Sequence, residues 1–180
     1  MDSFFSKLAA KRRFSIPLEI DLSQTNECHI VISCILGDRQ EARLIVDTGA
    51  SKSVFDKTIL APYIQAIDKT KYIQDLNVAW IKPAEIAMES IQEDDDQIVS
   101  AGVNGDPIDL DFFLLKKFQI GKLFFEDFPI VCIDLTNVNQ IFAKMNRKPI
   151  AGLLGSDFLL QYRAIIDYRS RKISFDSCFA

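Results

Sequence analysis

The sequence contains few of the residues on which metal and redox centres depend. It has one histidine, His29, and four cysteines, Cys28, Cys34, Cys132 and Cys178. No two cysteines stand in CxxC spacing, whereas a zinc site needs about four convergent ligands. We therefore expect no metal and no cofactor. The cysteines are expected to stay reduced and to pack as small apolar side chains, as in a reducing compartment.

Long apolar runs and an excess of positive charge are also missing. No window approaches the roughly 18 apolar residues that span a membrane, and the N-terminus lacks the apolar core of a signal peptide. The formal net charge is −4, whereas a dedicated nucleic-acid binder presents a basic surface. We predict a cytoplasmic protein without stable membrane insertion and without a nucleic-acid partner.

The composition is that of an ordinary folded domain. Hydrophobic residues make up 48% and charged residues 26% of the 180 residues, which is enough apolar material for a real core. The length predicts one domain over residues 14–180, preceded by a flexible N-terminal segment at 1–13. Residues 56–97 are expected to form a partly helical insertion. Apolar residues recur there at three- and four-residue spacings from Ile59 to Ile67, and 84–91 predict a second short helix.

Most of the remaining chain has the patterns of strands. Apolar and polar residues alternate strictly from Phe14 to Leu22, and Pro17 within this strand predicts an edge position. Further strands are predicted at 29–36, 39–46, 98–102, 108–115, 118–120, 122–125, 129–133, 150–154, 164–167 and 172–175. Residues 136–148 look irregular or weakly helical, and 157–162 predict a short helix capped by Ser156. The fold is therefore expected to be mainly β with two or three short helices.

One acidic residue, Asp47, follows an apolar run, a position at which desolvating a carboxylate costs free energy. The apolar run 44–46 leads directly into Asp47, and a carboxylate after a buried strand must be hydrogen-bonded to be stable. Gly49 lets the backbone N–H approach the carboxylate without a Cβ in the way. The hydroxyls of Thr48 and Ser51 are placed to hold the loop and to bond the carboxylate. The sequence thus presents one acid fixed in a tight loop.

Two motifs resemble the retropepsin-like aspartic proteases, the clan of retroviral proteases and their cellular relatives. Residues 46–51, Val-Asp-Thr-Gly-Ala-Ser, fit the family signature at every position. The second family signal is two apolar residues, a glycine and a helix, and residues 153–159 resemble it about a hundred residues downstream. Residues 152–159, Tyr162 and 166–168 are also similar to bacterial and cellular members. The resemblance covers roughly residues 28 to 176.

The resemblance implies a closed retropepsin-like β-barrel with one Asp-Thr-Gly loop per chain, in which Asp47 is catalytic. It implies an active-site loop formed by Thr48, Gly49, Ala50 and Ser51. The residues that it implies as supports of this loop are Leu153, Leu154 and Gly155. The residues that it places in a flap over the substrate are Ala101, Gly102 and Val103.

The chemistry of these enzymes requires a second carboxylate. Two carboxyl groups about 3 Å apart share one proton, so one activates a water while the other donates to the scissile carbonyl. This chain has one such loop, so the resemblance implies a homodimer with Asp47 from each subunit. The expected function is an aspartic endopeptidase acting on protein or peptide substrates. The C-terminal strand 172–175 is expected to build much of the dimer interface.

Two other interpretations remain open from the sequence. A non-catalytic homodimer could bind peptides in the same groove, because a fold does not fix a function. Such a protein would tolerate Asp47→Asn without loss of function. An all-β binding protein unrelated to proteases would instead be a monomer with Asp47 exposed in a turn.

Overall fold

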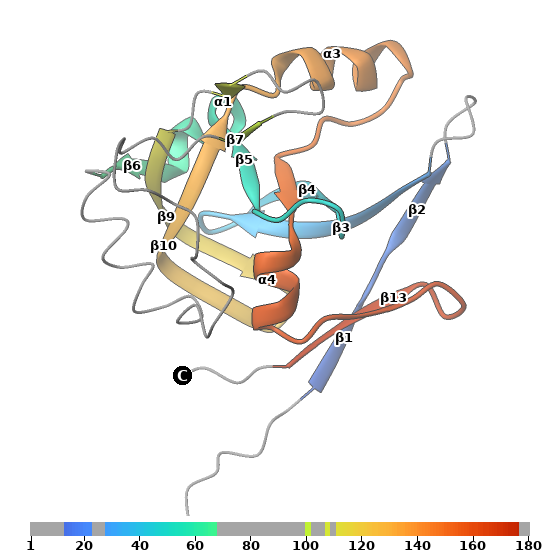
Figure 1. Ribbon diagram of the computed structural model, residues 1–180. Coiled ribbons are helices and arrows are strands. Elements are labelled where there is room, and N and C mark those ends of the chain that lie inside the picture. The colour runs from blue at the N-terminus through green and yellow to red at the C-terminus, as the bar shows by residue number, and fades with distance from the viewer. Residues whose placement is uncertain (1–12, 23–27, 68–99, 102–106, 109–110, 177–180) are drawn as a thin grey trace, which may run out of the picture.

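The structure is mainly β, with a closed barrel at its centre (Figure 1). It is a computed structural model, and it describes residues 13–22, 28–67, 100–101, 107–108 and 111–176. The strands of the largest sheet are β2 (Glu19–Leu22), β3 (Cys28–Leu36), β4 (Gln40–Val46), β5 (Val54–Asp56), β6 (Ile64–Ala66), β9 (Asp111–Ile120), β10 (Leu123–Ile133) and β11 (Gly152–Leu154).

The barrel closes because β3 pairs on both of its edges. It pairs with β4 along one edge, and on the other edge with β2 near its start and with β9 at its end, where Ile35 lies opposite Gln119. The ring therefore runs β3-β4-β11-β5-β10-β9 and returns to β3. The predicted fold class, a mainly β closed barrel with a few short helices, is confirmed.

The barrel strands place alternate side chains on opposite faces. Leu44 and Val46 of β4 point into the large apolar core, whereas Ile45 between them belongs to a second, smaller cluster. Aromatic rings pack at the centre of the main core, with Phe55 and Phe118 edge to face at 5.8 Å between ring centroids. Burying such a side chain contributes about 1.5–3 kcal/mol.

A small second sheet is formed by the two ends of the described chain. Its order is β1 (Arg13–Pro17), β13 (Lys172–Asp176) and β12 (Ile165–Asp167). Figure 1 shows β1 and β2 as one long ribbon that leads from this sheet to the barrel. The edge position predicted from Pro17 is confirmed.

The alternation from Phe14 to Leu22 predicted one strand, but the structure divides it between two sheets. The division falls at Leu18, which is 5% exposed and whose N–H donates to the carbonyl of Arg171 at 3.0 Å. Alternation reports which face is buried, and it does not report which neighbour a strand pairs with.

The helix predicted from Ile59 to Ile67 is wrong beyond its first turns. The described chain forms α1 (Lys57–Leu60) and a 3-10 turn (Ala61–Tyr63), and then enters β6. Pairing of β6 with β9 overrides the helical spacing of the apolar residues. The second predicted helix, 84–91, lies outside the described residues.

Two further helices follow the barrel strands. Helix α3 (Thr136–Lys144) is a regular helix where the sequence indicated an irregular or weakly helical segment. Helix α4 (Ser156–Gln161) is confirmed, but Gly155 is its N-cap and Ser156 its first residue. Among the described residues, no helix is both long and apolar enough to cross a bilayer.

Candidate active site

Asp47 begins the loop that joins β4 to β5. Its N–H donates to the carbonyl of Leu154 at 3.0 Å, which extends the pairing between β4 and β11 by one step. Its carboxylate oxygen Oδ1 accepts from the N–H groups of Gly49 at 2.9 Å and Ala50 at 3.3 Å. Charge-assisted bonds of this kind fix the orientation of a carboxylate.

Gly49 has the role that the sequence predicted for it. A Cβ at this position would lie 3.3 Å from Oδ1 of Asp47, which is closer than most Cβ contacts in proteins. The backbone N–H of Gly49 therefore reaches the carboxylate because no side chain intervenes. The predicted bond from Ser51 is not seen: in the described part of the chain, no hydroxyl donates to the Asp47 carboxylate.

The start of α4 holds this loop from its other side. Ser156 donates from its N–H to the carbonyl of Ala50 at 2.8 Å and from its Oγ to the carbonyl of Thr48 at 3.1 Å. A Cβ on Gly155 would lie 2.6 Å from the backbone of Lys52. Only glycine fits at this crossing, so the loop and the start of α4 pack backbone against backbone.

A network of hydrogen bonds among Ser53, Gly155 and Asp157, which was not predicted from the sequence, joins the same two segments. Ser53 Oγ donates to Asp157 Oδ1 at 2.7 Å and accepts from the N–H of Gly155 at 2.9 Å. The N–H of Ser53 also donates to the Asp157 carboxylate at 2.9 Å. Asp157 lies in the first turn of α4, where a negative charge is stabilised. The sequence features that could have indicated these hydrogen bonds were a serine at the end of the loop and an acid in the first turn of the predicted helix.

The cysteines and acids of the described residues form no metal site. No group of three or more His, Cys, Asp or Glu is placed there to hold an ion. Cys28, Cys34 and Cys132 are free thiols, and burial raises the pKa of both Cys34 and Cys132 to about 12. These two thiols are therefore poor nucleophiles, because the thiolate is the reactive form.

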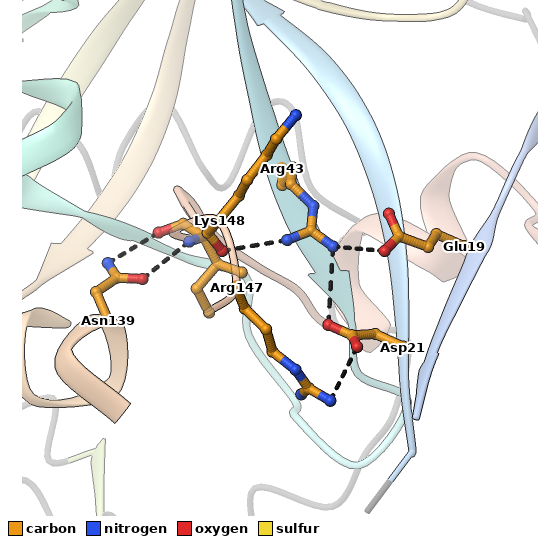
Figure 2. A network of polar contacts seen from close by, with 7 residues as sticks. Glu19, Asp21, Arg43, Asn139, Arg147 and Lys148 are labelled. Atoms are coloured by element: carbon orange, nitrogen blue, oxygen red, sulfur yellow. Dashed lines mark hydrogen bonds and ion pairs between the residues drawn. The ribbon is translucent and has the colours of Figure 1, made fainter. Parts of the chain in front are cut away.

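A polar cleft of about 420 Å³ lies between β2, β4 and the segment after α3. Figure 2 shows its ion pairs: Asp21 faces both Arg147 at 3.0 Å and Arg43 at 3.8 Å. Arg43 also pairs with Glu19 at 2.9 Å and donates to the carbonyl of Lys148 at 3.1 Å. The two guanidinium groups are thus paired within the chain, and they tie three segments together.

Two solved structures are similar to this chain over most of its length. A retropepsin-like aspartic protease from Rickettsia conorii is 16% identical, with 93% of each chain covered and a TM-score of 0.45. The retroviral protease-like domain of Ddi1 from Leishmania major is 11% identical, covers 83% of this chain and 89% of that chain, and has a TM-score of 0.40. Both are retropepsin-like. They are of the same class that the two sequence motifs resemble. No family model and no curated protein matches the sequence.

The structure brings most of the predicted site residues together. The loop residues 47–51 and the supporting residues 153–155 meet where β4 and β11 end. The predicted flap is described only in part. Ala101 lies in β7 (Ser100–Ala101), which pairs with β8 (Pro107–Ile108), and Gly102 and Val103 lie outside the described residues.

Proposed function

We propose that this chain is one subunit of a homodimeric aspartic endopeptidase. The observation that carries the proposal is the hydrogen bonding of the two oxygens of the Asp47 carboxylate. Its Oδ1 is fixed by two backbone N–H groups, whereas within the described ranges Oδ2 accepts no hydrogen bond. One oxygen is therefore held in place, and the other is left for a water molecule or a second carboxyl group.

Two other acids near the loop, Asp157 and Asp56, already accept hydrogen bonds from the chain. Asp157 accepts from Ser53 and from the N–H of Phe158 at 2.7 Å. Asp56 is 1% exposed and accepts from the N–H groups of Ile59 at 2.6 Å and Leu135 at 3.1 Å. Since neither acid is free to complete a dyad, we propose that a second copy of the chain supplies the partner Asp47.

The small sheet suggests how two copies meet. β13 lies between β1 and β12, so both of its edges are paired within one chain. In this proposal, the contact predicted through the C-terminal strand uses a neighbouring edge that the described strands leave unpaired, because a second chain can add strands at such an edge. We propose that the dimer pairs through this sheet, with β13 as its centre in each subunit.

The substrate in this proposal is an extended peptide that crosses the two Asp47 loops. The pair β7–β8 belongs to the proposed flap, which would contact the peptide backbone by strand addition. The setting is the cytoplasm, which fits the free thiols of Cys28, Cys34 and Cys132.

The test compares wild type, Asp47→Asn and Asp38→Asn on a proteome-derived peptide library read by mass spectrometry. Asp38 is a matched control, because it is an exposed acid in the β3–β4 turn, paired with Lys117. We expect wild type and Asp38→Asn to cut the same sites. The cleavage rate of Asp47→Asn should be lower than that of wild type by at least about a thousandfold, as expected for loss of an essential acid–base group. Specific activity should rise with protein concentration.

Other outcomes assign other functions. A dimer that cuts nothing and binds peptides equally well with Asp47→Asn would be the non-catalytic peptide-binding module. Full activity of a monomer at every concentration would contradict the shared dyad.

A further inference from the structure

The face of the barrel on which Asp47 lies is not the face of the main core. Side chains two residues apart along a strand share a face. Asp47 extends the pairing of β4 by one step, so its side chain shares a face with Ile45. On β11, Leu153 lies directly opposite Ile45 in the parallel register. The proposed substrate, lying across Asp47, would therefore run along the face that carries Ile45 and Leu153.

This face is occupied by a side chain of α3. Phe142, 5% exposed, packs in the second apolar cluster with Ile45, Val31 and Ile150, and Leu153 packs against that cluster. The Phe142 ring also lies 5.9 Å from that of His29, between centroids. His29 directly precedes Ile30, which pairs with Val46, so the ring of Phe142 lies beside the end of β4.

The position of Phe142 is fixed by contacts on both sides of it. Before it, Asn139 donates to the carbonyl of Ile150 at 3.1 Å and accepts from its N–H at 2.8 Å. After it, Arg147 pairs with Asp21, and the guanidinium carbon lies 5.8 Å from the centroid of the Phe142 ring. Figure 2 shows the hydrogen bonds of Asn139 and the ion pair between Arg147 and Asp21. The ring of Phe142 is therefore held in one position on this face of the barrel.

We infer that Phe142 is a specificity-determining residue of the groove, an inference that rests on the proposed peptidase function. It packs with Ile45 and against Leu153, the residues that share a face with Asp47. The side chain that flanks the scissile bond on this face must therefore be small. A large aromatic or branched side chain competes with the Phe142 ring for the same volume, and close-packed surfaces yield little.

The test uses peptide pairs built on cleavage sites found for the wild-type protein. The members of a pair differ only in an alanine or a phenylalanine next to the scissile bond, on each side in turn. We expect wild type to prefer alanine on one side by about tenfold or more in kcat/KM, the range that pocket size gives. Phe142→Ala should remove or reverse that preference, and Phe142→Leu should reduce it.

The control is Ile141→Ala, a neighbouring residue of α3 that is 51% exposed and should leave the ratio unchanged. A merely structural role for Phe142 would lower kcat/KM for both peptides by the same factor and leave their ratio intact. That outcome would overturn the inference while leaving the peptidase proposal standing. If the wild-type dimer cuts nothing, the peptidase proposal fails instead. Peptides that bind the protein are then selected from the same library, and the alanine-to-phenylalanine ratio is measured on them as affinity by fluorescence polarisation. A ratio that Phe142→Ala leaves unchanged overturns the inference there too.

Discussion

At the scale of single residues, the loop depends on a few polar groups, among which the hydroxyl of Ser53 makes two hydrogen bonds. Ser53 is 9% exposed, and its hydroxyl both donates to Asp157 and accepts from Gly155. A buried N–H that loses its acceptor keeps the full cost of desolvation. The hydroxyl of Ser53 therefore links the end of the Asp47 loop to the start of α4.

Ser53→Ala should weaken this link and destabilise the protein. We expect the free energy of unfolding to fall by about 1–3 kcal/mol, because the buried N–H of Gly155 loses the hydroxyl that accepts its hydrogen bond. Urea unfolding followed by circular dichroism measures it. The control is Ser15→Ala, which removes an exposed hydroxyl pair with Ser174 at 2.8 Å and should cost no more than about 0.5 kcal/mol. Equal losses of unfolding free energy for the two substitutions would show that the hydrogen bonds of the Ser53 hydroxyl stabilise the protein no more than an exposed hydroxyl pair does.

At the scale of elements, the sequence was informative wherever a local pattern carries the answer. The Asp47 loop was predictable, because an acid after an apolar strand needs backbone donors and Gly49 offers the approach. Strands such as β3 and β4 were predictable from apolar runs that end in turn residues.

The remaining elements depend on partners that are distant in the sequence. β6 has helical spacing and becomes a strand only because β9 offers a free edge. Closure of the barrel between Ile35 and Gln119 has no local signal. Ser53 and Asp157, which complete the site, stand 104 residues apart, so no local motif could join them.

The ion pairs beside α3 make a prediction at this scale. Asp21 faces two guanidinium groups, and the side chains of Asp21, Arg43 and Arg147 are only 13%, 14% and 12% exposed. Asp21→Asn should lower the free energy of unfolding by about 2 kcal/mol, because it leaves largely buried charges without a full partner. Chemical unfolding at low and high salt measures it, and the effect should persist in salt because buried pairs are weakly screened.

The matched control is Asp127→Asn. Asp127 pairs with Lys116 at 2.8 Å, but its side chain is 60% exposed, so the loss should stay below about 1 kcal/mol. If Asp21→Asn cost no more than this surface pair, the cluster in Figure 2 would be a solvated contact and would not hold α3 against the barrel.

At the scale of the whole molecule, the proposed dimer would use an edge that the described strands of one chain leave unpaired. In the small sheet those edges belong to β1 and β12. β1 contains Pro17, which has no N–H to offer a partner strand. β12 carries Ile165, which is 46% exposed, and Tyr168 beyond it is 59% exposed. Exposed apolar side chains on an unpaired edge favour β12 as the contact between subunits.

Ile165→Glu should therefore weaken the dimer, because it places a charge in an edge-to-edge contact that buries an apolar side chain. We expect the dimer dissociation constant to rise at least about tenfold, equivalent to about 1.4 kcal/mol. Sedimentation equilibrium measures the constant directly. Peptide cleavage should fall at low protein concentration and recover at high concentration, since each Asp47 loop is unchanged. Val138→Glu, at an exposed apolar position on α3 that is 36% accessible, provides the control and should leave the dissociation constant unaltered. A weaker dimer for Val138→Glu and not for Ile165→Glu would move the interface to α3 and away from the small sheet.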